Sequence, residues 1–505
     1  MNSKSRKMKR TLAIVPLLAL ALQGHAQQSV GLVTSNYSGS LSTIINPSLM
    51  ANSWLKADIN LFTLQAFMEN NYFYLPADEA GLLRLIRGDY NFPYFEKPYG
   101  RGERNVYSYY DDKSLKNILV HGRITGPSVM FSQQDHVFAL RTGARVMSST
   151  RRLPYDMANF AYYTMDFKPQ HNIYYVRDNY DMASMGWYEL TLSYATILKR
   201  SHSNHWSAGI SAGPRFGYSG AYITGNDTRY IAYNDSILNV EMLDAEIGIA
   251  LPFDYDEYNP AFEKPLIRGT GWGTDFGITW QYRDRPYQKK FPGNFYIKRF
   301  ESYKLKVGVS ITDIGWISFN SNAEKHVYDQ VHNNWIRVKE LQYESVREEL
   351  DKTSEIFYGD PNASLKDDQF RIYLPTAINV LIDYHFTDWW YLNALVVLPA
   401  KFYSPMIEMP VVISLTPRFE SKNLEIHIPL VLYDLQYPRF GFVVRLAGLT
   451  IGSDNLASVF GYKDFTGSDF YISYKVNIGN DGKNPFTSKG ACFNNWRKEL
   501  NKVHR

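Results

Sequence analysis

The feature that most constrains this chain is an alternation of apolar and polar residues with a period of two, which returns many times. In segment 303–311, tyrosine, leucine, valine and isoleucine occupy one set of alternate positions, and lysine, glycine and serine occupy the other. Segments 188–198, 276–282, 424–432 and 470–478 show the same pattern. Alternation over about 8–11 residues is typical of a β-strand with one apolar face. We therefore expect an all-β protein.

Segment length and composition indicate what surrounds the apolar face. A soluble β-sandwich alternates in the same way, but its strands average about 5–6 residues, which is shorter than these segments. Aromatic residues make up 15% of the chain, and several lie near the ends of the predicted strands. The mean hydropathy is −0.33, and after Leu22 no apolar run reaches the roughly 18 residues that a helical span needs. We therefore predict an antiparallel transmembrane β-barrel with a polar lumen side.

The first 26 residues have the three parts of a secretory signal peptide. Basic residues between Lys4 and Arg10 precede the short apolar stretch Thr11–Leu22, and Gly24 and Ala26 are small residues at the positions that signal peptidase reads. An uncleaved anchor is the alternative, but about twelve apolar residues are too few to cross a bilayer, which takes roughly 20. We expect the mature chain to begin after Ala26 and to reach the outer membrane of a Gram-negative cell.

About fourteen strands are predicted, an even number as in single-chain bacterial barrels. The candidate strands are 54–68, 116–132, 136–148, 186–199, 205–219, 237–250, 272–283, 302–312, 372–386, 389–400, 408–420, 423–433, 439–451 and 469–478. By parity the long connection 313–371 lies on the periplasmic side. Either a strand near Trp316–Asn320 has been missed or the barrel carries an insertion here, and within it Lys339–Phe357 has the composition of a charged surface helix.

The chain divides into four parts. Residues 1–26 form the signal peptide, 27–53 a plug-like N-terminal segment, 54–478 the barrel, and 479–505 a periplasmic tail. The segment 27–53 is rich in Ser and Asn and long enough to fold into the lumen.

Charge and cysteine content exclude several functional classes. The whole chain has 54 Lys and Arg against 50 Asp and Glu, and five of the basic residues lie in the signal peptide, so the mature balance is 49 against 50. A nearly neutral chain without a basic run offers no surface for nucleic acid. The single cysteine, Cys492, excludes an intramolecular disulfide framework and cysteine-based zinc sites.

Several stretches, taken in order, resemble a large Bacteroidota-type family of outer-membrane barrels of unknown function. They are Gly31–Phe62, Gly271–Arg283, Lys306–Phe319, Gly441–Phe460 and Gly467–Gly479. This family is distantly similar to the long-chain fatty-acid transporter barrels. The similarity implies a fourteen-stranded, transport-like barrel with an N-terminal plug and an Asn-Pro-Ala-type motif.

The tripeptide Asn46-Pro47-Ser48 stands where that motif would lie, with Ser48 in place of Ala. It is a candidate gate element of the plug. An ordinary turn is the alternative, because Pro47 restricts Asn46 and lacks a donor.

Charged residues on the polar faces of the predicted strands are candidates to line the lumen. They are Arg141, Arg145, Glu189, Arg215, Asp244, Glu246, Asp275, Arg283, Lys304, Lys306, Asp383, His385, Glu425, His427, Arg445 and Lys475. The two signs nearly balance, which favours a narrow or plugged barrel over an open porin, since rings of one sign are typical of ion-selective pores. His385 lies near Asp383 and His427 near Glu425, an arrangement that can serve general-base chemistry. We interpret both as hydrogen-bonded lumen pairs, because polar-lined barrels contain such neighbours.

The sequence therefore predicts a non-enzymatic barrel without a cofactor or metal. Our first hypothesis is porin-like passive transport of a small amphipathic or hydrophobic ligand across the outer membrane. The alternative is a non-transporting accessory barrel that docks an assembly or secretion complex. The expected partners are outer-membrane lipid, such a ligand, and a periplasmic or outer-membrane protein, with no nucleic acid.

Overall fold

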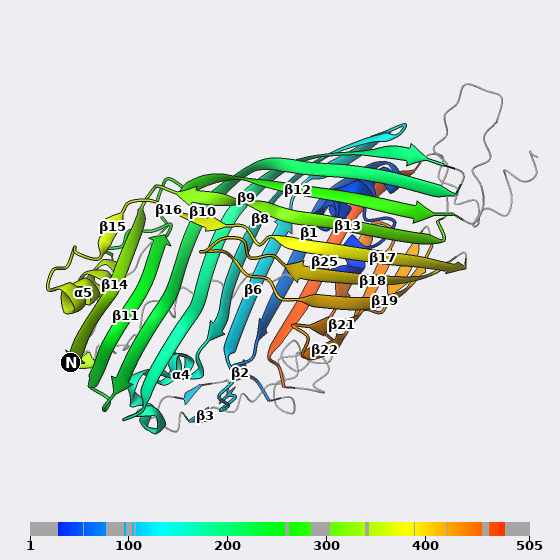
Figure 1. The fold of residues 1–505 in the computed structure, drawn as a ribbon. Coiled ribbons are helices and arrows are strands. Elements are labelled where there is room, and N and C mark those ends of the chain that lie inside the picture. The colour runs from blue at the N-terminus through cyan, green and yellow to red at the C-terminus, as the bar shows by residue number, and fades with distance from the viewer. Residues whose placement is uncertain are drawn as a thin grey trace, which may run out of the picture.

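The wall of the molecule is an antiparallel sheet that closes on itself. The structure, a computed structural model, describes residues 29–76, 95–96, 104–105, 108–338 and 343–479, apart from 54, 202, 258–261, 284–302, 388, 422 and 457–463. The last strand, β25 (Gly467–Gly479), pairs with the first, β1 (Leu55–Asn70), and this pairing closes the barrel (Figure 1). The predicted fold, an antiparallel barrel of 14 strands with an N-terminal segment, is confirmed. The predicted signal peptide, almost all of the tail and Cys492 lie outside the described residues.

Several of the 14 wall positions consist of two or three successive strands. After β1 the positions are, in chain order, β6 (Lys116–Thr125) with β7 (Ser128–Gln133), β8 (His136–Leu153), β9 (Tyr174–Arg200), β10 (Asn204–Ala232), β11 (Ile237–Ala250) with β12 (Gly269–Tyr282), β13 (Leu305–Phe319) with β14 (Ala323–Ile336), β15 (Leu365–Asp367) with β16 (Phe370–Tyr373) and β17 (Ala377–Thr387), β18 (Trp390–Pro399), β19 (Val412–Glu420), β20 (Leu424–His427) with β21 (Leu430–Tyr433), β22 (Tyr437–Phe440) with β23 (Phe442–Leu446), β24 (Leu449–Ser453) and β25. Two small hairpins, β2 (Phe73–Tyr74) with β5 (Ser108–Tyr109) and β3 (Phe95–Glu96) with β4 (Arg104–Asn105), lie outside this wall.

Two of the predicted strands are assigned differently in the structure, and the two differences cancel in the count. Segments 237–250 and 272–283 are successive pieces of one position, because β11 pairs with the second half of β10 and β12 with its first half. Segment 439–451 instead contains a hairpin, in which β23 turns into β24 through Ala447 and Gly448. Ala447 has a φ of 53°. Ala447-Gly448 lies within an apolar run and does not have the sequence of a typical turn. The segment was therefore predicted to be one strand.

Because β11 and β12 share one position in the wall, the connection predicted for 313–371 lies at the end of the barrel opposite to the predicted one. We call the end where β1 begins and β25 finishes the terminal end, and the opposite end the distal end. β13 runs on to Phe319 and is followed by β14, so the residues between β14 and β15 lie at the distal end and not the predicted periplasmic one. The predicted helix is present there as α5 (Val346–Tyr358), whose first turn is capped by the Ser345 side chain.

The two sides of the barrel differ in height. β9 and β10 contain 27 and 29 residues, whereas β18 and β19 contain 10 and 9. At about 3.3 Å per residue, the longer strands rise far beyond the shorter ones. Figure 1 shows β9, β10, β11 and β14 running on toward α5, while β17 to β19 stop short. We refer to the tall side, β8 to β14, and the short side, β17 to β25.

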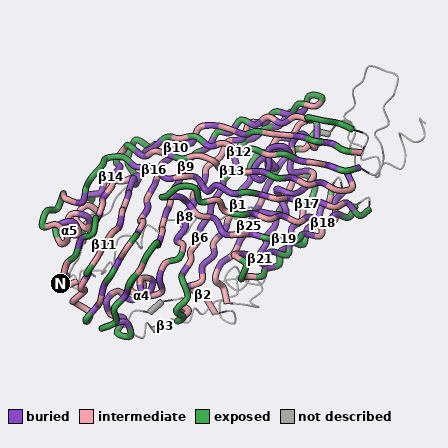
Figure 2. The backbone as a smooth tube through the Cα atoms, viewed as in Figure 1, coloured by how far each residue is buried: buried purple, intermediate pink, exposed green. Residues whose placement is uncertain are grey.

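An apolar belt surrounds the outside of the barrel. Exposed apolar side chains alternate with buried polar ones along the strands (Figure 2). Members of the belt include Leu190, Leu192, Ile210, Phe276, Ile278, Val309, Ile378, Ile382, Ile413, Leu415, Phe470 and Val476. On β12 the belt runs from Trp272 to Tyr282, which corresponds to roughly 25 Å of height for a strand tilted by about 40°. That height matches the hydrocarbon core that transmembrane barrels cross.

The helices that the described residues form are short. Besides α5, they are α2 (Val30–Val33), α4 (Tyr155–Tyr163) and the 3₁₀ turns η2 (Gly39–Ile44), η3 (Pro47–Asn52), η4 (Thr164–Asp166) and η5 (Lys168–Gln170). No helix in the described part of the chain is long and apolar enough to cross a membrane.

Candidate functional site

Residues 29–53 lie inside the barrel, and we call them the plug. They contain α2, η2 and η3 and no strand. All of the described plug residues are buried except Asn36, Leu49 and Asn52, which are half-buried. Because the plug belongs to no strand, its attachment to the wall rests on side-chain packing and on hydrogen bonds that involve side chains.

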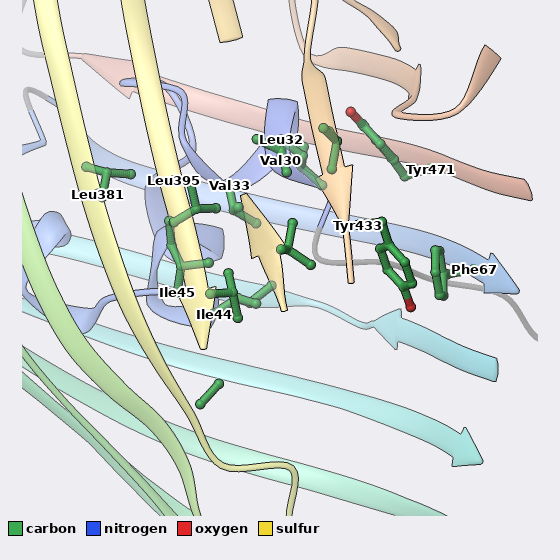
Figure 3. Packing of buried hydrophobic residues seen from close by; sticks show 14 of the residues in the cluster. Val30, Leu32, Val33, Ile44, Ile45, Phe67, Leu381, Leu395, Tyr433 and Tyr471 are labelled. Atoms are coloured by element: carbon green, nitrogen blue, oxygen red, sulfur yellow. The ribbon is translucent and has the colours of Figure 1, made fainter. Parts of the chain in front are cut away.

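One face of the plug is apolar and packs against the short side of the barrel. The residues that form this contact include Val30, Leu32, Val33, Ile44 and Ile45 of the plug and Phe67, Leu381, Leu395, Tyr433 and Tyr471 of the wall (Figure 3). Burying a side chain of the size of valine or leucine contributes roughly 1.5–3 kcal/mol. The apolar face is therefore the main source of plug affinity.

The polar face of the plug meets charged wall residues that we call the plug-binding cluster. The cluster consists of Asp58, Lys306, Asp383, Arg418, Glu420, Glu425, His427, Arg445 and Lys475, all of them buried. Ser35 Oγ donates to Glu425 at 2.9 Å, and Asn36 Nδ2 donates to Glu420 at 3.0 Å. Lys306 Nζ donates to Asn36 Oδ1 at 2.7 Å. The cluster thus supplies both acceptors and donors to the plug.

Arg418 is the centre of this cluster. Its Nη2 lies 3.0 Å from Asp383 Oδ2, and its Nε lies 2.8 Å from Glu420 Oε2. Its Nη1 donates to the Thr34 carbonyl oxygen at 3.1 Å. One fully buried guanidinium therefore links the plug backbone to Asp383 by charge-assisted hydrogen bonds, which are about twice as strong as neutral ones, and forms an ion pair with Glu420.

The tripeptide Asn46-Pro47-Ser48 opens η3 and is seated on β12. Asn46 Oδ1 accepts a hydrogen bond from Ser48 N at 2.9 Å, which caps the turn. Ser48 Oγ lies 2.7 Å from Thr279 Oγ1. The tripeptide is therefore both a turn and a contact between plug and wall.

Glycines in the wall make room for this tripeptide. Gly209 of β10 and Gly277 of β12 are register partners. A Cβ at Gly277 would lie 2.0 Å from Asn46 Oδ1, and a Cβ at Gly209 would lie 2.6 Å from the Pro47 carbonyl carbon. A larger residue at Gly209 would collide with the η3 backbone, and one at Gly277 would displace the Asn46 side chain that caps η3.

A second group of charges lies on the tall side, and we call it the arginine cluster. It consists of Arg123, Arg141, Arg145, Arg215, Glu189, Asp275 and Asp313. Arg145 Nη1 lies 2.8 Å from Asp313 Oδ1. Glu189 lies among the four arginines, but its nearest contacts to Arg145, Arg141 and Arg215 measure 3.6, 3.8 and 3.9 Å. These distances exceed those of a hydrogen bond.

An apolar cluster adjoins the arginine cluster toward the distal end. Its members include Met147, Met185, Trp187, Tyr222, Ile317, Phe319, Phe370, Ile372, Leu374 and Ile407. The Arg145 guanidinium lies 4.7 Å from the centre of the Trp187 ring, and it donates to Met147 Sδ at 3.4 Å. This distal apolar cluster and the arginine cluster together give the lumen one charged and one apolar zone.

A model of the family described as "Family of unknown function (DUF5723)" matches residues 47–454. The match takes in most of the chain, from the plug tripeptide to the end of β24. The chain belongs to this family. No curated protein matches the chain.

Solved structures align with this DUF5723 barrel only at low scores. The TodX deltaS2S3 mutant monoaromatic hydrocarbon channel has a TM-score of 0.40 and 8% identity, over 91% of this chain and 98% of its own. A FadL homologue from Pseudomonas aeruginosa has a TM-score of 0.28 and 11% identity, over 90% of this chain and 100% of its own. We draw no conclusion from TM-scores this low. The fold is instead established by the strand pairing within the DUF5723 barrel itself.

Most of the lumen residues predicted from the sequence are buried side chains of the wall. These are Arg141, Arg145, Glu189, Arg215, Asp275, Arg283, Lys306, Asp383, His385, Glu425, His427, Arg445 and Lys475. Asp244 and Glu246 are half-buried on the distal part of β11, where Glu246 Oε2 lies 2.9 Å from Lys325 Nζ.

Lys304 does not follow the predicted pattern. Its Nζ lies 4.7 Å from the ring centre of Tyr384, a residue that alternates with the buried side chains of β17. Tyr303, predicted to face lipid, is buried and donates to Asp383 Oδ2 at 2.6 Å. Both residues lie before Leu305, the first residue of β13, so their side chains do not follow the alternation of that strand.

The two predicted histidine–carboxylate pairs differ. His427 Nε2 lies 3.2 Å from Glu425 Oε2, whereas His385 Nδ1 contacts the Tyr303 carbonyl oxygen at 3.1 Å. Asp383 is instead paired with Arg418. Among the described residues, no group of three or more His, Cys, Asp or Glu side chains is placed to hold a metal ion.

Several residues of the site were not predicted from the sequence. They are Asp58, Arg123, Asp313, Arg418, Glu420 and Asp454. Arg418 and Glu420 had a signal, because they continue the polar face of β19. Arg123 had none, since segment 116–125 does not alternate cleanly.

The N-terminal end of the plug is held by Asp454, directly after β24. Val30 N donates to Asp454 Oδ2 at 3.0 Å, and Tyr471 OH donates to Oδ1 at 2.9 Å. Asp454 N in turn donates to Asp469 Oδ2 at 2.6 Å. Burial, and then the neighbouring carboxylate of Asp469, raise the pKa of Asp454 to about 8. Because burial raises the pKa of both carboxyl groups and the two repel each other, the pair Asp454 and Asp469 resists full ionisation.

The plug fits closely against the wall. A cavity of about 20 Å³ remains between Thr34–Asn36 of the plug and Lys306 and Leu381 of the wall. That volume holds about one water molecule. Between these residues the plug and the wall leave no room for a larger molecule.

Proposed function

We propose that this barrel lies in the outer membrane and passively transports a small amphipathic or hydrophobic ligand, without a catalytic step and with residues 29–53 as a movable plug. One observation carries the proposal: the plug lies inside a closed barrel and belongs to no strand. A segment outside the sheet can leave its place without breaking a strand pair. The apolar belt supports the membrane location.

The lining of the lumen supports an amphipathic ligand. The arginine cluster and the distal apolar cluster are neighbours, joined by the contact between Arg145 and Trp187. Binding sites for small ligands are mostly apolar with a few placed polar groups. A ligand with an apolar body and one polar end fits both zones.

Deletion of Val30–Ser48 tests whether the plug closes the lumen. If it does, the deleted barrel remains folded and heat-modifiable on gels, and its conductance in planar bilayers rises markedly above that of the full chain. Replacing the charged residues of α5 with alanine is the matched control, because α5 lies at the distal end. Unchanged conductance of a folded deletion variant would contradict the transport proposal.

A reversible lock tests whether the plug has to move. Ser48 Oγ and Thr279 Oγ1 lie 2.7 Å apart, so Ser48→Cys with Thr279→Cys, on a Cys492→Ser background, places two thiols across the contact. Oxidation should abolish uptake of decanoate into liposomes, and reduction should restore it. Each single cysteine variant serves as a control. Uptake that is equal in both redox states would exclude plug movement.

A non-transporting accessory barrel is the second candidate, favoured by the close fit of the plug and the cavity of only about 20 Å³. Such a barrel would dock an outer-membrane assembly or secretion complex. The same deletion separates the two functions, because a docking barrel would keep a flat conductance and lose a co-purifying partner.

A further inference from the structure

The arginine cluster carries more positive than negative charge. Four arginines, Arg123, Arg141, Arg145 and Arg215, face three carboxylates, Glu189, Asp275 and Asp313, which leaves a formal excess of 4 − 3 = +1. All except Asp313 are at most 3–4% exposed, and the Asp313 side chain is 14% exposed. An uncompensated buried charge is costly unless a counter-ion accompanies it.

Several guanidinium nitrogens of this cluster have no hydrogen-bond partner within the described part of the protein. These atoms are Nε and Nη1 of Arg123, Nε and Nη1 of Arg141, and Nε and Nη2 of Arg215. Both carboxylate oxygens of Glu189 also have no hydrogen bond, although four arginines attract them. Buried donors in folded proteins are almost always satisfied, so each exception calls for a ligand or an ordered water.

The arginine cluster borders apolar side chains on its distal side. Met147 and Met185 lie beside the arginine cluster, on its distal side. Arg145 contacts both Met147 and the Trp187 ring. Methionine side chains adapt to apolar surfaces of varied shape. Planar guanidinium groups match a carboxylate or phosphate in a two-point geometry.

We infer that the arginine cluster is a binding site for a compact anionic group, such as a carboxylate or phosphate. This inference rests on the proposed transport function: the site holds the charged end of an amphipathic anion, and the apolar part of that anion contacts the distal apolar cluster. The bound anion supplies the acceptors that Arg123 and Arg141 lack. It also neutralises the excess charge, which Glu189 alone does not.

The test measures binding to the purified full chain in detergent, by calorimetry, with three named probes. Decanoate is the amphipathic anion, decanol has the same apolar chain without charge, and inorganic phosphate is the free anion. Decanoate should bind more tightly than decanol. Arg123→Gln or Arg141→Gln should weaken decanoate at least about tenfold, since a hydrogen bond to a charged group is worth about 1.5–3 kcal/mol. Binding of decanol should not change.

Two further variants control for folding and for net charge. Arg123→Lys keeps the charge but loses the two-point geometry, so it should weaken decanoate binding less than Arg123→Gln does. Arg229→Gln removes one positive charge from an exposed residue of β10 that pairs with Asp227, and it should leave decanoate binding unchanged. All variants are checked for heat-modifiability on gels before binding is measured.

The outcomes separate the sources of the anion and the two proposals. Competition of phosphate with decanoate supports an anion site that free phosphate can also fill, and absence of competition supports the amphipathic ligand. Decanoate affinity that is equal to that of decanol, or unaltered in both glutamine variants, overturns the site. If decanoate binds through the arginines but plug deletion leaves conductance flat, the site stands and transport fails. If conductance rises without arginine-dependent binding, transport stands and the site fails.

Discussion

The plug-binding cluster and the arginine cluster are built from the same residue types and differ in how their charges are satisfied. In the first, Arg418 lies within 3.0 Å of two carboxylates and donates to the plug backbone. In the second, Arg123 has nitrogens without hydrogen-bond partners among the described residues, and the nearest nitrogens of Arg145, Arg141 and Arg215 lie 3.6–3.9 Å from Glu189. Charges that find partners within the chain fix one arrangement, whereas charges that do not are available to a ligand. The predictions below test this difference.

The largest effect is expected at Arg418. Arg418→Met leaves Glu420 buried without its cation and Asp383 with only Lys306, whose Nζ lies 3.8 Å from Asp383 Oδ2. Breaking a buried pair costs about 3–5 kcal/mol. The substitution also removes the hydrogen bond to Thr34 of the plug. Urea unfolding, followed by loss of heat-modifiability, measures the change. A loss below about 1 kcal/mol, the range of a surface ion pair, would show that this cluster does not hold the fold together.

The fit of the tripeptide should matter next. Gly277→Ala places a Cβ 2.0 Å from Asn46 Oδ1, and overpacking of this kind costs about 1–3 kcal/mol. Because the Asn46 side chain that caps η3 is displaced, the plug should be held less firmly and conductance should also rise. Gly308→Ala is the graded control, since its Cβ would lie 3.0 Å from Asn46 Nδ2. Equal effects of the two substitutions would mean that the contact with Asn46 is not the cause.

The Asp454 contact should make stability depend on pH. Burial and Asp469 raise the pKa of Asp454 from about 3.8 to about 8. Between these values the folded chain holds a proton that the unfolded chain has lost, so stability falls as the pH rises, by up to about 1.4 kcal/mol per pH unit. Urea unfolding near pH 5, 7 and 9 measures the slope, and Asp454→Asn should flatten it. A variant with the slope of the unmodified chain would contradict this assignment.

The smallest effect on stability is expected at Arg123. In the absence of ligand, Arg123→Met should change the unfolding free energy by less than about 1 kcal/mol, or stabilise the protein, because replacing an unpaired buried charge removes a desolvation penalty. The contrast with Arg418→Met is the direct test of the comparison. A loss as large as that of Arg418→Met would mean that the two clusters play the same structural role.

The sequence predicted the barrel because alternation is a local property that every strand expresses. It predicted the side of most wall residues for the same reason, including Lys306 and Asp383. It failed at Tyr303 and Lys304, which precede the strand, and at β11 and β12, whose shared position depends on pairing with distant parts of β10. Strand partners are set by tertiary contacts, which no local period records.

The charged residues show the same limit. Their overall balance predicted a plugged lumen, but a sum over the sequence does not reveal that arginines gather on β6, β8 and β10 while mixed pairs gather on the short side. The plug segment was predicted from its length and composition. Its contacts with Glu420, Glu425 and Arg418 could not be, because each joins residues more than 380 positions apart.

The closure of the wall between β1 and β25 has a consequence for assembly. The plug directly precedes β1, so it enters the nascent barrel at the seam where the first and last strands meet. Once β25 has paired with β1 the barrel is closed, and the hydrogen bond between Val30 N and Asp454 Oδ2 lies inside it. Residues 29–53 therefore have to enter the barrel before β25 pairs with β1.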